Sequence, residues 1–175
     1  IEPVDFLQKI PELGVYLEQE CYNKLSGDQQ DLLLSTSIIR EITPDLVYYL
    51  SGEKGGQILN ELLTKNLLIC SIENSDSHVY RKHPLWHSFL AQKAKDVWGQ
   101  DKIQNLHRKA GEYFCTQENW KNAIYHYVQG RELKRAIEVL KRSGPEVLDF
   151  KLASELQSLV SIYPDDPWLK FAFAC

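Results

Sequence analysis

The sequence predicts a mainly α-helical fold: a winged-helix domain with one β-hairpin, followed by an α-helical arm of the helical-repeat type. Apolar residues recur at helical spacing through most of the 175 residues. Residues 66–82 instead have two apolar runs, rich in β-branched or aromatic residues, on either side of a polar turn. We expect the end of a preceding domain or a linker at residues 1–14, the winged helix at 15–98, and the arm with the start of a helical-repeat sensor region at 99–175.

The first helices are predicted from their spacing and their caps. Residues 13–24 have the apolar spacing that is typical of the end of a helix. Ser26 is then expected to begin a new helix, because Gln29 follows three residues later and completes a capping box. The three leucines at 32–34 supply the buried face of this helix.

Two further helices and the hairpin complete the predicted winged helix. Thr43 is expected to cap a helix that has Pro44 at its first position and that ends at Gly52. Another helix is predicted over residues 55–66. The two apolar runs then form the strands of the hairpin, with its turn at 73–77, and these are the only strands that the pattern predicts.

The arm is predicted as a series of helices. Apolar stripes at residues 84–98 and 101–117 each define one buried face, and the first stripe includes Val97. Residues 119–128 and 132–141 carry the same apolar pattern with a shift of 13 residues, which fits a small antiparallel helix stack. The helical pattern resumes at 151–163, and Asp166-Pro167 is expected to open a last helix.

Composition bounds the class of protein. The chain is 43% hydrophobic and 25% charged, and no apolar run approaches the ~20 residues that span a bilayer. We therefore expect a cytoplasmic protein without membrane contact. Ile1 is no natural start and is followed by no signal peptide, so the chain is predicted to be part of a longer protein. The four widely spaced cysteines predict reduced, mostly buried thiols.

Charge is distributed unevenly along the chain. Residues 1–77 have 13 acidic and 5 basic residues, whereas residues 78–142 have 13 basic and 6 acidic ones. The basic block would attract a nucleic acid or another anion, or it would merely solvate several helices; the spread of its bases favours the second interpretation. The helix at 56–65 offers Lys65 against Glu61, so this winged helix is not expected to read DNA.

Catalysis and metal binding find little support in the sequence. His78, His83 and His87 are close in the chain, but no acidic or thiolate ligand accompanies them, which favours ordinary histidines over a metal site. The glycine-rich stretch at 51–57 lacks the P-loop pattern and is better explained by the end of one helix and the start of another. No nucleophile–base spacing is present either, so we expect no enzyme activity from this segment.

One junction offers a candidate anion site. Pro84 suits the first position of a helix, which makes His83 the cap residue, and histidine is a poor cap. The amides of Leu85, Trp86 and His87 are then predicted to be open donors at the positive end of a helix, beside an imidazole. Such a place receives an anion such as a phosphate. The alternative is a satisfied histidine that packs against the hairpin.

A family resemblance supports the anion site. The span from Tyr22 to Leu90 contains "LLLSTSII", "LNELLTKNLL" and "VYRKHPLWHSFL", and it resembles the winged-helix segment of the MalT-like regulators, which are large ATP-binding LuxR-type proteins of the STAND class of signalling ATPases. The matching positions are Leu25, Leu33, Leu34, Thr36, Ser37, Ile38, Leu59, Leu62, Asn66, Leu67, Tyr80, Arg81, His83, Leu85, Phe89 and Leu90. Residues 106–140 and 152–174 continue the resemblance more loosely, like the helical arm and the start of the sensor.

The resemblance implies a nucleotide switch. An upstream ATPase domain, absent from this chain, would hold ADP or ATP, and His83 would contact the ADP phosphates in the resting form. Inducer binding to the downstream sensor and exchange of ADP for ATP would release the winged helix and permit self-association, while DNA would be bound only through other domains. Lys82 stands where the family has an aromatic residue, and Arg81 and Lys82 would add positive charge near the phosphate.

A second class of function remains open. Trp120, Tyr127 and Trp168 would line an aromatic-rich face of a helical-repeat scaffold that binds another protein without any nucleotide switch. A P-loop in the sequence upstream would support the switch, and its absence would favour the scaffold. Salt-sensitive retention on DNA would instead identify the basic block as a nucleic-acid contact.

Overall fold

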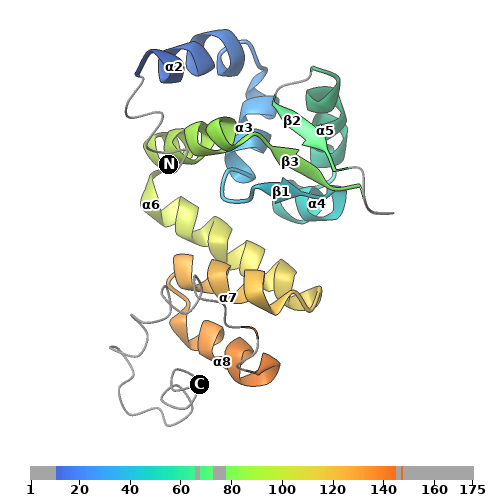
Figure 1. Ribbon diagram of the computed structural model, residues 1–175, viewed down its shortest axis with the longest axis vertical. Coiled ribbons are helices and arrows are strands. Elements are labelled where there is room, and N and C mark those ends of the chain that lie inside the picture. Colours follow the sequence, from blue (N-terminus) through green and yellow to red (C-terminus); the bar gives the residue numbers. More distant parts are fainter. Residues whose placement is uncertain (1–10, 66–67, 73–77, 145–146, 148–175) are drawn as a thin grey trace. The chain divides into compact units, whose positions relative to one another are not determined.

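A computed structural model describes residues 11–65, 68–72, 78–144 and 147 (Figure 1). The chain divides into two compact units between Ile103 and Gln104. The described residues are mainly helical and include one small sheet, which confirms the predicted fold class. The hairpin turn predicted at 73–77 and the helices predicted beyond residue 150 lie outside the described residues.

The first unit begins with α2 (Pro11–Tyr16), which continues into the π-helix η1 (Leu17–Tyr22). The sequence predicts the end of a helix at residues 13–24. The structure has a helix there, but its second half is a π-helix, in which amides donate to carbonyls five residues earlier, as the Asn23 amide does to the Glu18 carbonyl. Leu17 and Tyr22 are buried in this turn. The ring of Tyr22 meets Phe89 edge-on, with 6.0 Å between the centroids, which attaches η1 to the helix α6 (Pro84–Thr116).

Helix α3 (Gly27–Ser35) begins with the predicted capping box. The Gln29 amide donates to Ser26 Oγ at 3.3 Å, and the Ser26 amide donates to Gln29 Oε1 at 3.4 Å. The leucines at 32–34 are buried, as predicted. The cap fixes where α3 begins, and the leucines fix how it packs.

The next two helices also follow their local signals. Helix α4 (Pro44–Ser51) is capped by Thr43 and ends at Gly52, whose φ of 77° suits glycine. Helix α5 (Lys54–Thr64) follows, so the glycine-rich stretch is indeed a helix end and a helix start. Of the apolar residues on one side of α5, Leu59 and Leu62 are buried.

A three-stranded antiparallel sheet completes the winged helix (Figure 1). The predicted hairpin is confirmed as β2 (Ile69–Ser71) paired with β3 (Tyr80–Lys82). The prediction that the hairpin holds the only strands is wrong, because β1 (Glu41–Ile42) pairs with the other edge of β3. A two-residue strand has no apolar period to detect, and it is defined only by its distant partner.

Helix α6 is interrupted at Gly99, where φ is 75° and ψ is 171°. This break explains why the sequence showed two separate stripes. Trp86, Phe89 and Leu90 are buried as predicted, but Val97 is 54% exposed. Helical spacing shows which residues share one face of a helix, but it does not show how much of that face other elements bury. The prediction that Val97 belongs to the buried face is wrong for this reason.

The second unit contains α7 (Trp120–Gln129) and α8 (Leu133–Ser143) beside the end of α6. Ala123 and Ile124 of α7 and their counterparts Ala136 and Ile137 of α8 all lie in one buried cluster. The shift of 13 residues therefore does correspond to two helices that pack through equivalent positions. Close approach also matters here, because a Cβ atom at Gly111 would lie 2.8 Å from Tyr127 Cδ1.

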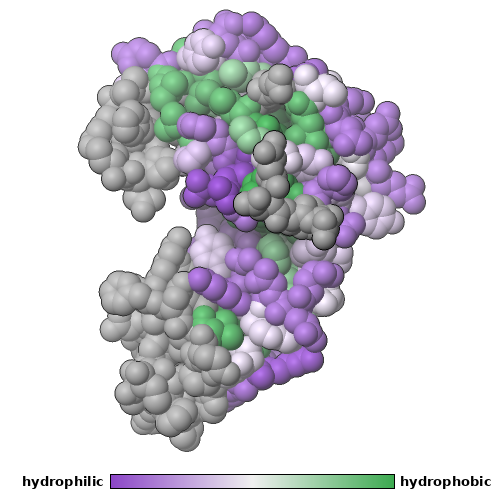
Figure 2. Space-filling view, turned by 45° about the vertical axis from the view of Figure 1, so that its right-hand side comes forward, coloured by the Kyte–Doolittle hydropathy of each residue, from purple (hydrophilic) through white to green (hydrophobic). Residues whose placement is uncertain are grey.

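The surface is mostly hydrophilic, with hydrophobic residues gathered over part of the first unit (Figure 2). Among the described residues of this unit, the most exposed large hydrophobic side chains are those of Tyr48, Tyr16, Val97 and Val15. The prediction of mostly buried thiols is wrong for the three cysteines that the structure describes, since Cys70 is exposed and Cys21 and Cys115 are partly exposed. Among the described helices, none has the length and apolarity that a membrane span requires.

Candidate functional site

The candidate site lies where strand β3 passes into helix α6. The main chain of His83 is fixed there, because its amide donates to the Leu68 carbonyl at 2.7 Å and its carbonyl accepts from the His87 amide at 2.9 Å. The imidazole is nevertheless exposed to solvent. The junction is thus tied to the hairpin through its backbone, while the His83 ring does not pack into it.

His83 itself caps the helix. The Leu85 amide donates to His83 Nδ1 at 3.3 Å, so the prediction that this helix start is left uncapped is wrong. An imidazole that accepts a hydrogen bond at Nδ1 carries its ring proton on Nε2. The cap therefore fixes the tautomer, and it leaves an exposed N–H donor at the positive end of a helix.

Arg81 lies on the solvent face of β3. Its Nε donates to Glu41 Oε1 at 2.8 Å, and the same carboxylate lies 2.5 Å from its terminal nitrogen. Glu41 and Arg81 are opposite each other across the β1–β3 ladder. Since about half of each side chain is exposed, this ion pair is screened by water, and it partly neutralises the positive charge predicted here.

Lys82 occupies the other face of the strand and is fully buried. Its ammonium group donates to the Thr36 carbonyl at 2.5 Å, to Thr36 Oγ1 at 3.0 Å and to the Ile39 carbonyl at 3.0 Å. Burial lowers the pKa of Lys82 to about 7. This position corrects the expectation that Lys82 adds its charge directly to a phosphate, because strand alternation turns it inward when Arg81 points outward.

Three side-chain polar groups of the first unit, two of them within four residues of His83, are buried without a hydrogen-bond partner among the described residues. They are Trp86 Nε1, His87 Nε2 and Ser37 Oγ. Burial, followed by the charges of Lys82 and Arg40, lowers the pKa of His87 to about 4. His87 is therefore neutral at physiological pH and adds no positive charge to the candidate site.

The three histidines proposed as possible metal ligands differ in their surroundings. His78 and His83 are exposed, whereas His87 is largely buried. In the part of the chain that the structure describes, no three His, Cys, Asp or Glu side chains are grouped as metal ligands. At the junction itself, the exposed His83 ring carries a hydrogen-bond donor at Nε2.

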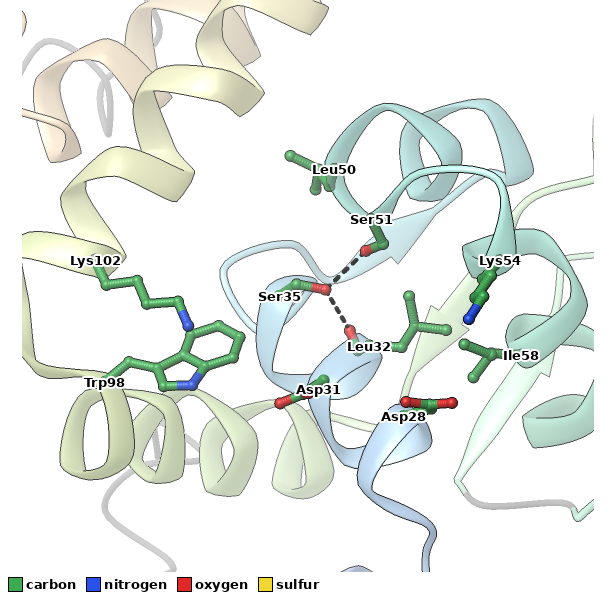
Figure 3. A pocket seen from close by; sticks show the side chains of 10 residues that line it. All are labelled: Asp28, Asp31, Leu32, Ser35, Leu50, Ser51, Lys54, Ile58, Trp98 and Lys102. Atoms are coloured by element: carbon green, nitrogen blue, oxygen red, sulfur yellow. Dashed lines mark hydrogen bonds between the residues drawn. The ribbon is translucent and has the colours of Figure 1, made fainter.

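A separate pocket of about 340 Å³, which no pattern in the sequence predicts, lies in the first unit (Figure 3). Ser35 Oγ and Ser51 Oγ lie 2.9 Å apart in it, and Lys102 Nζ lies 3.5 Å from the centroid of the Trp98 ring. The full lining is Asp28, Asp31, Leu32, Ser35, Leu50, Ser51, Lys54, Ile58, Trp98 and Lys102. Charges of both signs line this pocket, and none of the predicted site residues does.

Comparison with known proteins agrees with the winged-helix fold of the first unit. Residues 18–102 match the family model described as the MalT winged helix domain. Two relatives are named HTH-type transcriptional regulator MalT, one from Klebsiella pneumoniae subsp. pneumoniae and one from Cronobacter sakazakii; they are 26% identical over 128 and 129 residues. Each match covers 73% of this chain but only 14% of the relative, so the chain spans a small part of their length. Residues 18–102 of this chain are therefore similar to the MalT winged helix domain.

Proposed function

We propose that this chain is the regulatory part of an ATP-dependent, effector-sensing transcriptional activator. In this proposal the winged helix closes over ADP that is bound to an upstream ATPase domain. The family match and the transcriptional regulators among the relatives support the class of protein. The arm and the downstream sensor then transmit effector binding, and nucleotide exchange permits self-association of a cytoplasmic protein that binds DNA through other domains.

One observation carries the proposal: the capped, solvent-exposed imidazole of His83. Its Nε2–H is free of the helix cap and lies where the dipole of α6 favours negative charge. A phosphate oxygen is an acceptor of matching charge and size. The Arg81–Glu41 pair beside it contributes little net charge, so the histidine is the principal donor that this domain offers to ADP.

The test removes this donor in the full-length protein. His83→Ala is expected to accelerate the release of a fluorescent ADP analogue about tenfold, because a hydrogen bond to a charged group contributes about 1.5–3 kcal/mol. Transcription without inducer should rise in parallel. His78→Ala is the matched control, since His78 is exposed but lies outside the helix start. Unchanged ADP release together with unchanged uninduced transcription would reject this role for His83.

A second candidate function is supported by the arm. Trp120 and Tyr127 line one pocket of about 410 Å³, and they do so with Arg135 and Arg142. The Arg142 guanidinium lies 5.0 Å from the Trp120 ring, and that of Arg135 lies 5.9 Å from the Tyr127 ring. Aromatic and arginine side chains are typical anchors of protein interfaces. Trp168, the third predicted member of this face, lies outside the described residues.

Substitution in this pocket separates the two candidates. Trp120→Ala should abolish capture of a partner protein if the chain is only a scaffold, and it should leave ADP release unchanged. A P-loop in the preceding sequence would favour the switch, as would loss of ADP retention in His83→Ala. Salt-sensitive retention of the chain on DNA would point to the basic block instead.

A further inference from the structure

The residue next to His83 connects two distant parts of the winged helix. The three oxygens around Lys82 Nζ belong to residues just beyond the end of α3. The last carbonyls of a helix have no partner within it, and the negative end of the helix dipole attracts a cation. Lys82 therefore binds the C-terminal end of α3, 46 residues away in the sequence from Thr36.

The acceptors of this lysine are themselves held in place. Thr36 Oγ1 donates to the Leu32 carbonyl at 2.9 Å, and the Ile39 amide donates to the Thr36 carbonyl at 3.1 Å. The three hydrogen bonds of the Lys82 ammonium group, called the Lys82 anchor below, are therefore made to a turn that is itself held by hydrogen bonds. Within the described residues none of the hydrogen-bonding partners of the ammonium group is a carboxylate.

Backbone hydrogen bonds of Lys82 and His83 connect the Lys82 anchor with the candidate site. The Lys82 amide donates to the Arg40 carbonyl at 3.0 Å on one side of β3, and the next amide, that of His83, donates to the Leu68 carbonyl at 2.7 Å on the other. The cap from the Leu85 amide to His83 Nδ1 is long, at 3.3 Å, so that a small displacement of the junction would break it.

We propose that Lys82 is a positioning residue, which holds the His83 ring in its capping orientation by binding the C-terminal end of α3. This inference rests on the proposed function, because the contact that it positions is the one proposed for ADP. The end of α3 then becomes a second point from which the retention of ADP is controlled. An aromatic side chain in place of Lys82 would fill the same space without this link.

The anchor is expected to respond to pH. The titratable or charged groups near it are His87 on α6, Arg40 before β1, and the mutually neutralising Arg81 and Glu41 on the solvent face of the sheet. A neutral amine has lost one donor and the attraction of the helix end. Since burial lowers the pKa of Lys82 to about 7, the anchor weakens as the pH rises through neutrality.

The experiment measures release of a fluorescent ADP analogue by the full-length protein from pH 6 to pH 9. The wild type should release it about tenfold faster at the upper end, whereas Lys82→Met should release it fast at every pH. Thr36→Val removes one acceptor and should give an intermediate profile. Lys65→Met is the control, because Lys65 is exposed and its Nζ contacts Gln29 instead.

A second measurement separates this inference from the proposed function. Hydrogen exchange of the Leu85 amide in the 175-residue chain should accelerate about tenfold in Lys82→Met, while amides of α7 keep their rates. If Lys82→Met matches the wild type in ADP release and in exchange while His83→Ala loses ADP, the positioning role is overturned and the ADP contact stands. If His83→Ala retains ADP but the Leu85 amide still exchanges faster in Lys82→Met, the proposed function fails and the positioning of His83 stands. A change in exchange that is equal in α6 and α7 would also overturn the positioning role.

Discussion

The first unit, which contains the winged helix, and the second unit, called the arm below, both bury titratable nitrogen atoms, but these atoms have different hydrogen-bond partners. In the winged helix, Lys82 donates to oxygens beyond the end of α3, more than 40 residues away in the sequence. In the arm, His107 Nδ1 and His126 Nδ1 lie 2.9 Å apart, so that two imidazoles share one hydrogen bond. The first arrangement links distant segments, whereas the second links neighbouring helices.

This difference predicts separate pH windows for the two units. The pKa of Lys82 falls from 10.5 to about 7 on folding, because burial disfavours the charged amine; the free-energy cost of burying that charge is present in full below pH 7 and disappears as the pH rises to 10.5, even though the neutral amine makes weaker hydrogen bonds. Burial, with the charge of His107 as a second cause, lowers the pKa of His126 from 6.5 to about 3. The contribution of His126 is therefore present above pH 6.5 and is lost as the pH falls towards 3.

The largest expected effect is acid destabilisation of the arm. Between pH 6.5 and 3 the unfolded chain binds one more proton at His126, which lowers the free energy of unfolding by about 1.4 kcal/mol per pH unit. His126→Phe should remove that slope. The measurement is denaturant unfolding from pH 4 to 7, followed by signals from α7 and α8. Phe114→Leu is a suitable control, because Phe114 stacks on His126 but does not titrate. An unchanged slope in His126→Phe would contradict the prediction.

The corresponding effect in the winged helix occurs at higher pH. From pH 7 to 9.5 the wild type should gain up to about 1.4 kcal/mol per pH unit relative to Lys82→Met, because the unfolded lysine still binds its proton. Unfolding followed in α3 and α5 measures the difference, and Lys65→Met serves as the control. A constant difference between the wild type and Lys82→Met across this range would show that Lys82 stays charged when buried.

The same comparison shows what the sequence could predict. The caps at Ser26 and Thr43 and the helix end at Gly52 depend on neighbours within a few residues, and all three were predicted correctly. Strand β1 and the buried position of Lys82 depend on partners that are tens of residues away, and both were missed.

The candidate site shows the same division between local and distant signals. The sequence located His83 at the start of a helix, but the geometry of its ring was needed to show that it caps that helix. A signal for Lys82 did exist, because side chains alternate between the two faces of a strand and the neighbouring Arg81 is on the solvent face. The resemblance suggests that Lys82 adds charge near a phosphate but leaves the orientation of its side chain open, and the structure shows that this position in the strand is an interior one.

A smaller effect is expected where the arm is most tightly packed. Gly111→Ala would place a Cβ atom 2.8 Å from Tyr127 Cδ1, which should lower the free energy of unfolding of the arm by about 1–3 kcal/mol. Denaturant unfolding at pH 7 measures this. In the double variant Gly111→Ala/Tyr127→Leu the two changes should be less costly together than their separate costs predict, because the clash is relieved. Strict additivity would refute close packing as the cause.

The smallest effect has the opposite sign and lies in the winged helix. Gly56 is in α5, and a Cβ atom there would meet nothing within 4 Å. Gly56→Ala should therefore raise the free energy of unfolding by about 0.5–1 kcal/mol, since alanine reduces the conformational entropy of the unfolded chain. The adjacent Gly55 is the matched control, because its Cβ atom would lie 3.0 Å from Val47 Cγ1 and 3.2 Å from the Val47 carbonyl oxygen. The gain should be absent or reversed in Gly55→Ala, and an equal gain at both positions would mean that helix propensity alone, without packing against α4, determines stability in α5.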